Sequence, residues 1–454
     1  MRWRMTKPEV KAFLQKYELD AEQIDMTQEL GHMLEAMSIG LLPDQEADRL
    51  AKLYDSLPLA MLPTFIGVEN KVPFEKPCIV LDAGGTNFRV AVLTMHANKQ
   101  PDIEHFAVYP MPGSEAELSK VEFYDKIVSF IEPVINLSDD IGFCFSYPAE
   151  IMPNRDGRVL SFTKQVRAPE VVGGLIGEDL KAALKRRNLP SDKNICILND
   201  TVATLLGGRA SMSEELYDSF VGFIWGTGVN AAYVEKCQEI SKIHAQLSSE
   251  QLGERMIINT ESGYHRPLLS SEIDMEMDEG TVDPGRSLLE KRVSGRYLGL
   301  LCLYVIRKAM QDGLFSNFFI TNFSGINQLT TKDLDAYMRQ PFGQSVLSKS
   351  CANDIDRQTL YYIIDNLFER ASRYVVTLIA AILVKSGLGK NPLKPTVVTM
   401  DGSTYYNSLL LPNKVNYYVK QFINSKLNLN IRFNKTENGN LVGAAIAALT
   451  NRKA

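Results

Sequence analysis

The stretches CIVLDAGGTNFRVAVL, from Cys78 to Leu93, and VGFIWGTGVNAAYVE, from Val221 to Glu235, decide the fold of this chain. Each consists of an apolar run, a tight turn of glycine and threonine, and a second apolar run. Because glycine has no Cβ atom, the backbone N–H groups of such a turn can approach an anion closely. Two such turns in one chain predict two α/β lobes with a polyphosphate held between them.

The composition is that of an ordinary globular chain. The 454 residues are 45% hydrophobic and 23% charged, and the formal net charge is -5. This length predicts two or three domains. A mildly acidic chain lacks the basic face that nucleic acid or an anionic membrane surface would require, so we expect neither partner. An anionic nucleotide must then be bound locally, by turns, a few cations and a metal ion.

The sequence predicts a cytoplasmic protein without membrane insertion. The N-terminus, MRWRMTKPEVKAF, has no long apolar core after its basic residues, which argues against a secretory signal. The longest apolar stretch, near 374–384, is too short for a bilayer and indicates a buried helix. Six cysteines are scattered without a C-x-x-C pair, as expected of buried thiols in a reducing compartment. The five histidines form no H-E-x-x-H or similar motif, which argues against a zinc site.

Hydrophobic periodicity divides the chain into helical and mixed segments. Amphipathic patterns predict helices from Lys7 and over 21–39, before a crossing near Met61 to Gly67. From Cys78 onward strands alternate with helices, and longer helical patterns return over 283–311 and 358–385. We predict N-terminal helices packing on the large domain (1–66), a small α/β domain (67–200), a large α/β domain (201–440) and a C-terminal helix returning to the small domain (441–454).

Three turns combine glycine with a hydroxyl group at the end of a predicted strand. No G-x-x-x-x-G-K-[ST] motif is present, which excludes a P-loop fold. An ordinary hairpin turn is the alternative for each one taken singly, but three in one chain favour phosphate binding. The turns are Gly84-Gly85-Thr86-Asn87, Gly226-Thr227-Gly228 and Gly402-Ser403-Thr404.

Charged residues flank the first turn and follow a later strand. Asp82 could hold Mg²⁺ through water, with an Asx-type turn cap as the alternative. Arg89 is placed to reach a phosphate or to pair with a surface carboxylate. Asp200 follows the strand from Asn194 to Leu198 and opens a helix, where active sites gather in α/β sheets. It could accept the proton of an attacking hydroxyl group, or Asn199 and Asp200 could simply cap the helix.

A further group of polar residues suits a polyol, whose hydroxyl groups both donate and accept hydrogen bonds. Spacing alone does not single these residues out, and for Glu290 a solvated helix face is the alternative. The group comprises Ser146, Thr163, Lys164, Asn230, Asn259, Thr260, Glu261 and Glu290.

The order of the motifs resembles the hexokinase family from about Met61 to the C-terminus. The resemblance implies an actin-like ATPase (ribonuclease H-like) α/β fold, with a cleft between a small and a large domain that closes on sugar and ATP. The motifs are DAGGTNFRV (82–90), FSYP (145–148), SFTK (161–164), NDTVATL (199–205), WGTGVNAAYVE (225–235), INTESG (258–263), DPGRSLLEKRVSGRYLG (283–299), MDGSTYY (400–406) and GNLVGAA (439–445).

The resemblance implies transfer of the γ-phosphoryl group of MgATP to the 6-hydroxyl of glucose or a related hexose, the first step of glycolysis. By family pattern Asp200 is the general base, with Lys164 as the second catalytic residue. The sugar side comprises Ser146, Thr163, Lys164, Asn199, Asp200, Asn230, Glu261 and Glu290. The nucleotide side comprises Asp82 (Mg²⁺, through water), Gly84, Gly85, Thr86, Asn87, Arg89, Thr227, Gly228, Thr321, Gly402, Ser403, Thr404 and Gly443.

Three departures from the family pattern leave the preferred hexose open. TKQVR, NTESG and NDTVATL stand where the family has TKGF(K), NTEWG and NDTVGT. Glucose is favoured, with mannose, fructose or an amino sugar as alternatives, and a phosphate donor other than ATP stays open. A rival from another class is a sugar sensor that binds without turnover, which the retained Asp82, Lys164 and Asp200 argue against. The chain is expected to be a monomer or a homodimer.

Overall fold

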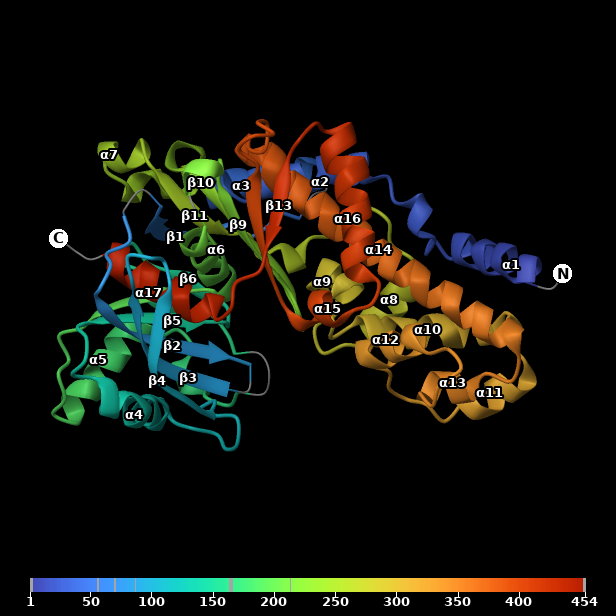
Figure 1. Ribbon diagram of the computed structural model, residues 1–454, viewed down its shortest axis with the longest axis horizontal. Coiled ribbons are helices and arrows are strands. Elements are labelled where there is room, and N and C mark those ends of the chain that lie inside the picture. Colours follow the sequence, from blue (N-terminus) through green and yellow to red (C-terminus); the bar gives the residue numbers. More distant parts are fainter. Residues whose placement is uncertain are drawn as a thin grey trace.

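Two lobes, each built on its own sheet, make up the molecule (Figure 1). The computed structural model describes residues 3–54, 57–68, 71–85, 87–162, 166–212 and 214–451. The small lobe carries a five-stranded sheet and the large lobe a six-stranded one. Both turns that opened the sequence analysis join neighbouring antiparallel strands, one turn in each lobe.

The small-lobe sheet has the strand order β4-β3-β2-β5-β8. Alternate residues of β2 point to opposite faces. Ile79 and Leu81 enter a core beneath α4 and α5, whereas Cys78 and Val80 enter a second core on the other face. The elements are β2 (Pro77–Gly84), β3 (Asn87–Met95), β4 (Pro101–Pro110), β5 (Asp140–Phe145), β8 (Asn194–Leu198), α4 (Lys120–Ile131) and α5 (Ile176–Arg186), with the short pair β6 (Ala149–Ile151) and β7 (Gly157–Val159) beside them.

The large-lobe sheet has the order β1-β11-β10-β9-β12-β13. The segment that the sequence marks as a crossing, Met61 to Gly67, is largely the strand β1, which pairs with β11. The strands are β1 (Leu62–Gly67), β9 (Phe220–Trp225), β10 (Val229–Lys236), β11 (Arg255–Asn259), β12 (Thr396–Asp401) and β13 (Ile431–Asn434).

The 33-residue helix α14 (Asp354–Ser386) runs through the large-lobe core. The N-terminal helices α1 (Trp3–Lys16) and α2 (Met26–Ile39) pack against it. The predicted helical segment 283–311 is two helices, α9 (Leu288–Val293) and α10 (Leu298–Gln311). The remaining helices are α3 (Asp44–Tyr54), α7 (Ser249–Leu252), α8 (Glu272–Glu279), α11 (Asn317–Phe323), α12 (Thr331–Arg339), α13 (Val346–Ser350), α15 (Ser403–Asn407), α16 (Leu411–Tyr418) and the π-helical turns Val419–Lys426.

Two helices rich in small residues join the lobes. α6 (Asp200–Ser211) packs on β9 and β10, α17 (Gly439–Thr450) packs on β5 and β2, and the two helices contact each other. A Cβ atom on Gly443 would lie 1.9 Å from the carbonyl oxygen of Ala203, so glycine permits this close approach. The structure thus gives Gly443, which we predicted on the nucleotide side, a position in the contact between helices.

The length and apolar character of the described helices show whether any of them could span a membrane. None of them combines the length and the apolar character that a bilayer span requires. All six cysteines are free thiols and are buried.

Candidate functional site

The register of the small-lobe sheet brings two carboxylates to one edge. Asp82 on β2 lies opposite Cys144 on β5, which in turn lies opposite Leu198, two residues before Asp200. Burial and then the carboxylates of Asp82 and Asp200 raise the pKa of the Cys144 thiol, as expected if both acids lie close to it. Because the parallel strands β2, β5 and β8 all end here, this edge is the place where ligands bind in open α/β sheets.

Asp200 is the first residue of α6 and is half-buried. Asn199 caps this helix, its side-chain oxygen accepting from the backbone N–H of Thr201 at 2.9 Å. The positive end of the helix dipole stabilises a carboxylate at this position in its charged form. Asn199 therefore caps α6, which was the alternative to a role in sugar binding. The same cap holds the Asp200 carboxylate at the sheet edge.

A network of side-chain amides faces this edge from the large lobe. Asn259, the last residue of β11, donates to Oε1 of Glu261 at 2.8 Å and accepts from Nδ2 of Asn230 at 2.8 Å. The hydroxyl of Thr201 lies 3.4 Å from the Asn259 oxygen and 2.7 Å from the Asn199 oxygen. Asn199 from the small lobe and both Asn259 and Glu261 from the large lobe line the same pocket.

Glu261 is half-buried and has a strained backbone conformation. Its φ of 53° lies in the left-handed region, which is uncommon for non-glycine residues and costs backbone strain. Burial, opposed by the Asn259 hydrogen bond and reinforced by the charges of Asp200 and Glu290, raises its pKa to about 7. Near neutral pH this carboxyl group can therefore donate as well as accept a hydrogen bond, which suits a sugar hydroxyl.

Glu290 is not a solvated helix residue, so that interpretation was wrong. Its Oε2 atom accepts from the backbone N–H of Val229 at 3.1 Å. A Cβ atom on Gly228 would lie 2.6 Å from the same oxygen, so the glycine of the second turn makes room for this carboxylate. Glu290 thereby links the sugar-side residues to a turn assigned to phosphate.

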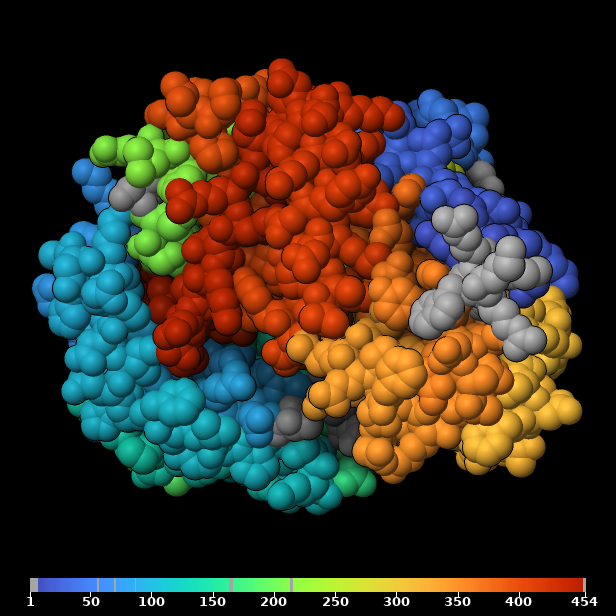
Figure 2. All heavy atoms as spheres, turned by 45° about the vertical axis from the view of Figure 1, so that its right-hand side comes forward, coloured from blue at the N-terminus to red at the C-terminus, as the bar shows by residue number. Residues whose placement is uncertain are grey.

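The second and third predicted turns pack against each other. Thr404 donates to the carbonyl of Gly226 at 2.7 Å, and Gly402, with φ 118°, lies against the backbone of Trp225. The side chains of Thr227 and Ser403 stay exposed. The surface is hollowed between the cyan part of the small lobe and the orange part of the large lobe (Figure 2).

The first turn carries an ion pair. Nη1 of Arg89 lies 2.6 Å from Oδ2 of Asp82, and these residues pair directly across β2 and β3. The Asp82 side chain is 2% exposed. Gly84 and Gly85 lie at the turn with the exposed Asn87, and the Tyr147 hydroxyl donates to the Gly85 carbonyl at 2.9 Å. Arg89 therefore contacts a carboxylate, the alternative to a phosphate in the sequence interpretation, although this acid is buried.

Some of the predicted site residues lie far from the site, and others lie outside the residues that the structure describes. Thr86, Thr163 and Lys164 lie outside the described residues. Thr321 lies on α11, far along the large lobe from the turn of β2 and β3, and its hydroxyl donates to the carbonyl of Asn317 (Figure 1). Ser146 is half-buried beside the first turn, where its backbone N–H donates to the Ala83 carbonyl.

The sequence alone did not identify the residues that hold the site residues in place. We grouped Asn259 with polyol-binding residues but did not select it, although it is the hub of the amide network. Gly295 and Arg296 donate through their backbone N–H groups to the second turn, at Gly226 and Thr227. Because these contacts join residues far apart in the sequence, no local pattern could have revealed them.

A two-lobed α/β fold with phosphate-suited turns, and with Asn199, Asn259 and Glu261 in a pocket between its lobes, is typical of a phosphotransferase for a small polyhydroxy substrate. Two family models, both described as Hexokinase, match residues 9–210 and 220–450 of this chain. The chain therefore belongs to the hexokinase family and is an ATP-dependent hexose kinase.

Relatives and solved structures agree with this family. The chain is similar to hexokinase-2, chloroplastic, of Nicotiana tabacum, with 29% identity, covering 82% of this chain and 78% of that protein. It is 28% identical to hexokinase-1 of Schizosaccharomyces pombe, covering 83% and 79%. A Schistosoma mansoni hexokinase structure, 23% identical, aligns over 99% of both chains with a TM-score of 0.74. This likeness confirms the predicted actin-like fold.

Proposed function

We propose that this hexokinase transfers the γ-phosphoryl group of MgATP to the 6-hydroxyl of glucose or a closely related hexose, with Asp200 as general base. The observation that carries the proposal is that Asn199 and Asp200 face Asn259 and Glu261 from the opposite lobe. The Schistosoma mansoni relative was solved in complex with glucose, which supports glucose as the first hexose to test.

The sugar is held by groups that can both donate and accept. Asn199, Asn230, Glu261 and Glu290 supply amides and carboxyl groups around the pocket, with Ser146 at its wall. Thr163 and Lys164 complete the proposed sugar side by family pattern. These contacts place the 6-hydroxyl near Asp200, which takes its proton as the oxygen attacks the γ-phosphorus and the bond to the leaving ADP oxygen breaks.

The nucleotide phosphates lie along the turns at 84–87, 227–228 and 402–404. Asp82 suits a Mg²⁺ ion bound through water, because Mg²⁺ prefers oxygen ligands and keeps several waters. The buried Asp82 carboxylate lies at the sheet edge beside the first turn, and Arg89 balances its charge. When bound, the ion would neutralise phosphate charge. Closure of the lobes on the sugar excludes water and limits ATP hydrolysis.

The decisive experiment replaces the proposed base. Asp200→Asn should lower kcat by roughly 10²–10⁴-fold, the usual contribution of a general base, while glucose still binds in calorimetry. Asp102→Asn, an exposed acid on β4, is the matched control and should keep wild-type turnover. Near wild-type turnover of Asp200→Asn would show that another group takes the proton.

The preferred hexose, the phosphate donor and the oligomeric state are tested in separate experiments. Sugar-dependent ADP release with glucose, mannose, fructose and an amino sugar, with ATP and other donors, ranks the substrates. Sugar binding without ADP release in every combination would support the sensor instead. Six buried free thiols support a cytoplasmic location, and light scattering distinguishes a monomer from a homodimer.

A further inference from the structure

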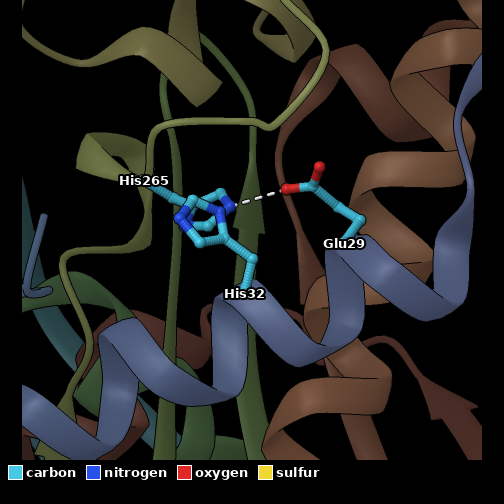
Figure 3. A group of neighbouring side chains, drawn as sticks. All are labelled: Glu29, His32 and His265. Carbon is cyan, nitrogen blue, oxygen red and sulfur yellow. Dashed lines mark hydrogen bonds and ion pairs between the residues drawn. The ribbon is translucent and has the colours of Figure 1, made fainter. Parts of the chain in front are cut away.

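Three metal-binding side chains meet behind the sugar pocket in the described part of the chain. Glu29 and His32 project from α2 toward His265, which follows the short 3₁₀ turn Ser262–Tyr264 (Figure 3). One ligand atom from each residue lies within 4.8 Å of the others. Glu29 and His265 are 236 positions apart in the sequence, which is why the histidine spacing gave no sign of this cluster.

The Glu29 carboxylate is fixed from both sides. The Nε2–H group of His265 donates to its Oε1 atom at 2.7 Å, and the backbone N–H of Leu268 donates to its Oε2 atom at 3.0 Å. Glu29 is 2% exposed and His265 is 1% exposed. Two of the three side chains are therefore buried and held in place, rather than meeting by chance on the surface.

Several polar atoms of this site have no hydrogen-bond partner among the described residues. They include Nδ1 of His32, Nδ1 of His265 and, one turn further along α2, Oε1 of Glu35. A buried polar atom without a partner is costly, and its presence in a native fold calls for an unseen ligand or another role.

The donor set is that of a zinc site. Two imidazoles and one carboxylate are a recurrent zinc triad, with water or a further acid as the fourth ligand. The spacing of three between Glu29 and His32 places both side chains on one face of α2, as in metal-binding helices of bundles. Zinc–ligand distances of about 2.0–2.2 Å require the three side chains to draw together, and the half-buried His32 has room to turn.

We propose that Glu29, His32 and His265 bind one Zn²⁺ ion, which takes the place of the proton between Glu29 and His265 while that proton moves to Nδ1 of the same ring. The ion joins α2 to the loop that carries Glu261. It also supports α9, since the carbonyl of His265 accepts from the backbone N–H of Leu289 at 2.9 Å, next to Glu290. Both carboxyl groups of the sugar pocket are thereby attached to the zinc-bound segment.

Zinc binding to the whole chain tests the proposal. After removal of metals with a chelator, calorimetric titration with ZnCl₂ should show one saturating equivalent per chain. His32→Gln, on the more accessible ligand, should weaken this affinity by roughly tenfold or more. Zn²⁺ should raise the thermal midpoint of the wild type and not that of this variant. Co²⁺ should give the visible absorption of a low-coordinate site.

His96→Gln is the matched control, because His96 and Glu75 form the other histidine–carboxylate contact described, on the surface. This variant should bind Zn²⁺ like the wild type. Circular dichroism of both variants without metal establishes that they are folded. The proposal is overturned if the wild type binds no Zn²⁺ equivalent, if His32→Gln binds it equally tightly, or if the equivalent is lost in His96→Gln.

Discussion

Asn259 donates a hydrogen bond to Oε1 of Glu261 across 2.8 Å, and its own oxygen accepts from Asn230. One amide thus orients both a carboxyl group and a second amide at the pocket. The backbone of Glu261, held at φ 53°, aims its side chain where Asn259 can reach it. In the proposed sugar site Asn259 therefore acts by positioning Glu261 and Asn230.

Asn259→Ala should weaken glucose binding more than it slows turnover. Removing the amide takes the 2.8 Å donor from Glu261 and the acceptor from the Nδ2 group of Asn230, at a cost of about 1–3 kcal/mol, or roughly tenfold to a hundredfold in KM. Steady-state kinetics and calorimetry with glucose measure this. Asn194→Ala is the control, since that half-buried amide donates to Asp140 and to the carbonyl of Ala448. An unchanged glucose KM in Asn259→Ala would contradict the orienting role.

Glu261→Gln should make the free energy of unfolding depend less on pH between about pH 5 and pH 8. In the folded state the pKa of Glu261 is raised from 4.5 to about 7, so between these values the folded protein keeps a proton that the unfolded chain has lost. Stability from this group is thus full below about pH 4.5 and falls until about pH 7, by on the order of 3 kcal/mol.

Urea unfolding at pH 5 and pH 8 measures this effect. The glutamine variant should lose less stability between the two pH values than the wild type, because an amide does not ionise. Glu104→Gln, an exposed acid on β4, should leave the wild-type pH dependence intact. If Glu261→Gln follows the wild-type curve, Glu261 does not titrate in this range.

The strands, the turns and the class of reaction could be predicted from the sequence because they depend on local patterns. An apolar run that ends in Asp82 or in Asn199-Asp200 marks a strand end wherever it occurs. The role of Glu290 could not be read in the same way, since the N–H group that it contacts lies 61 positions away. Likewise, the sequence near Met61 to Gly67 indicates only a connection between domains. The partner of the edge strand β1 lies far away in the sequence and cannot be read from the strand itself.

Asp82→Asn should raise the Mg²⁺ concentration required for half-maximal rate by roughly tenfold or more, as the loss of an outer-shell carboxylate does. Glucose binding without nucleotide should stay unchanged, because Asp82 lies on the phosphate side. Asp140→Asn is the control, a buried acid at the opposite end of the same sheet. Equal Mg²⁺ dependence of Asp82→Asn and the wild type would remove Asp82 from the metal site.

Gly443→Ala should destabilise the contact between the lobes. Its Cβ atom would meet the Ala203 carbonyl at 1.9 Å, far inside contact distance, so α17 must move away from α6. Such overpacking costs about 1–3 kcal/mol and often more when backbone must shift. Gly31→Ala in α2 is the matched control: its Cβ meets nothing within 4 Å, so alanine should stabilise by about 0.5–1 kcal/mol. Thermal unfolding should thus shift in opposite directions for the two variants. A midpoint for Gly443→Ala equal to the wild type would mean that the helices separate without cost, and that the glycine serves the nucleotide rather than the packing.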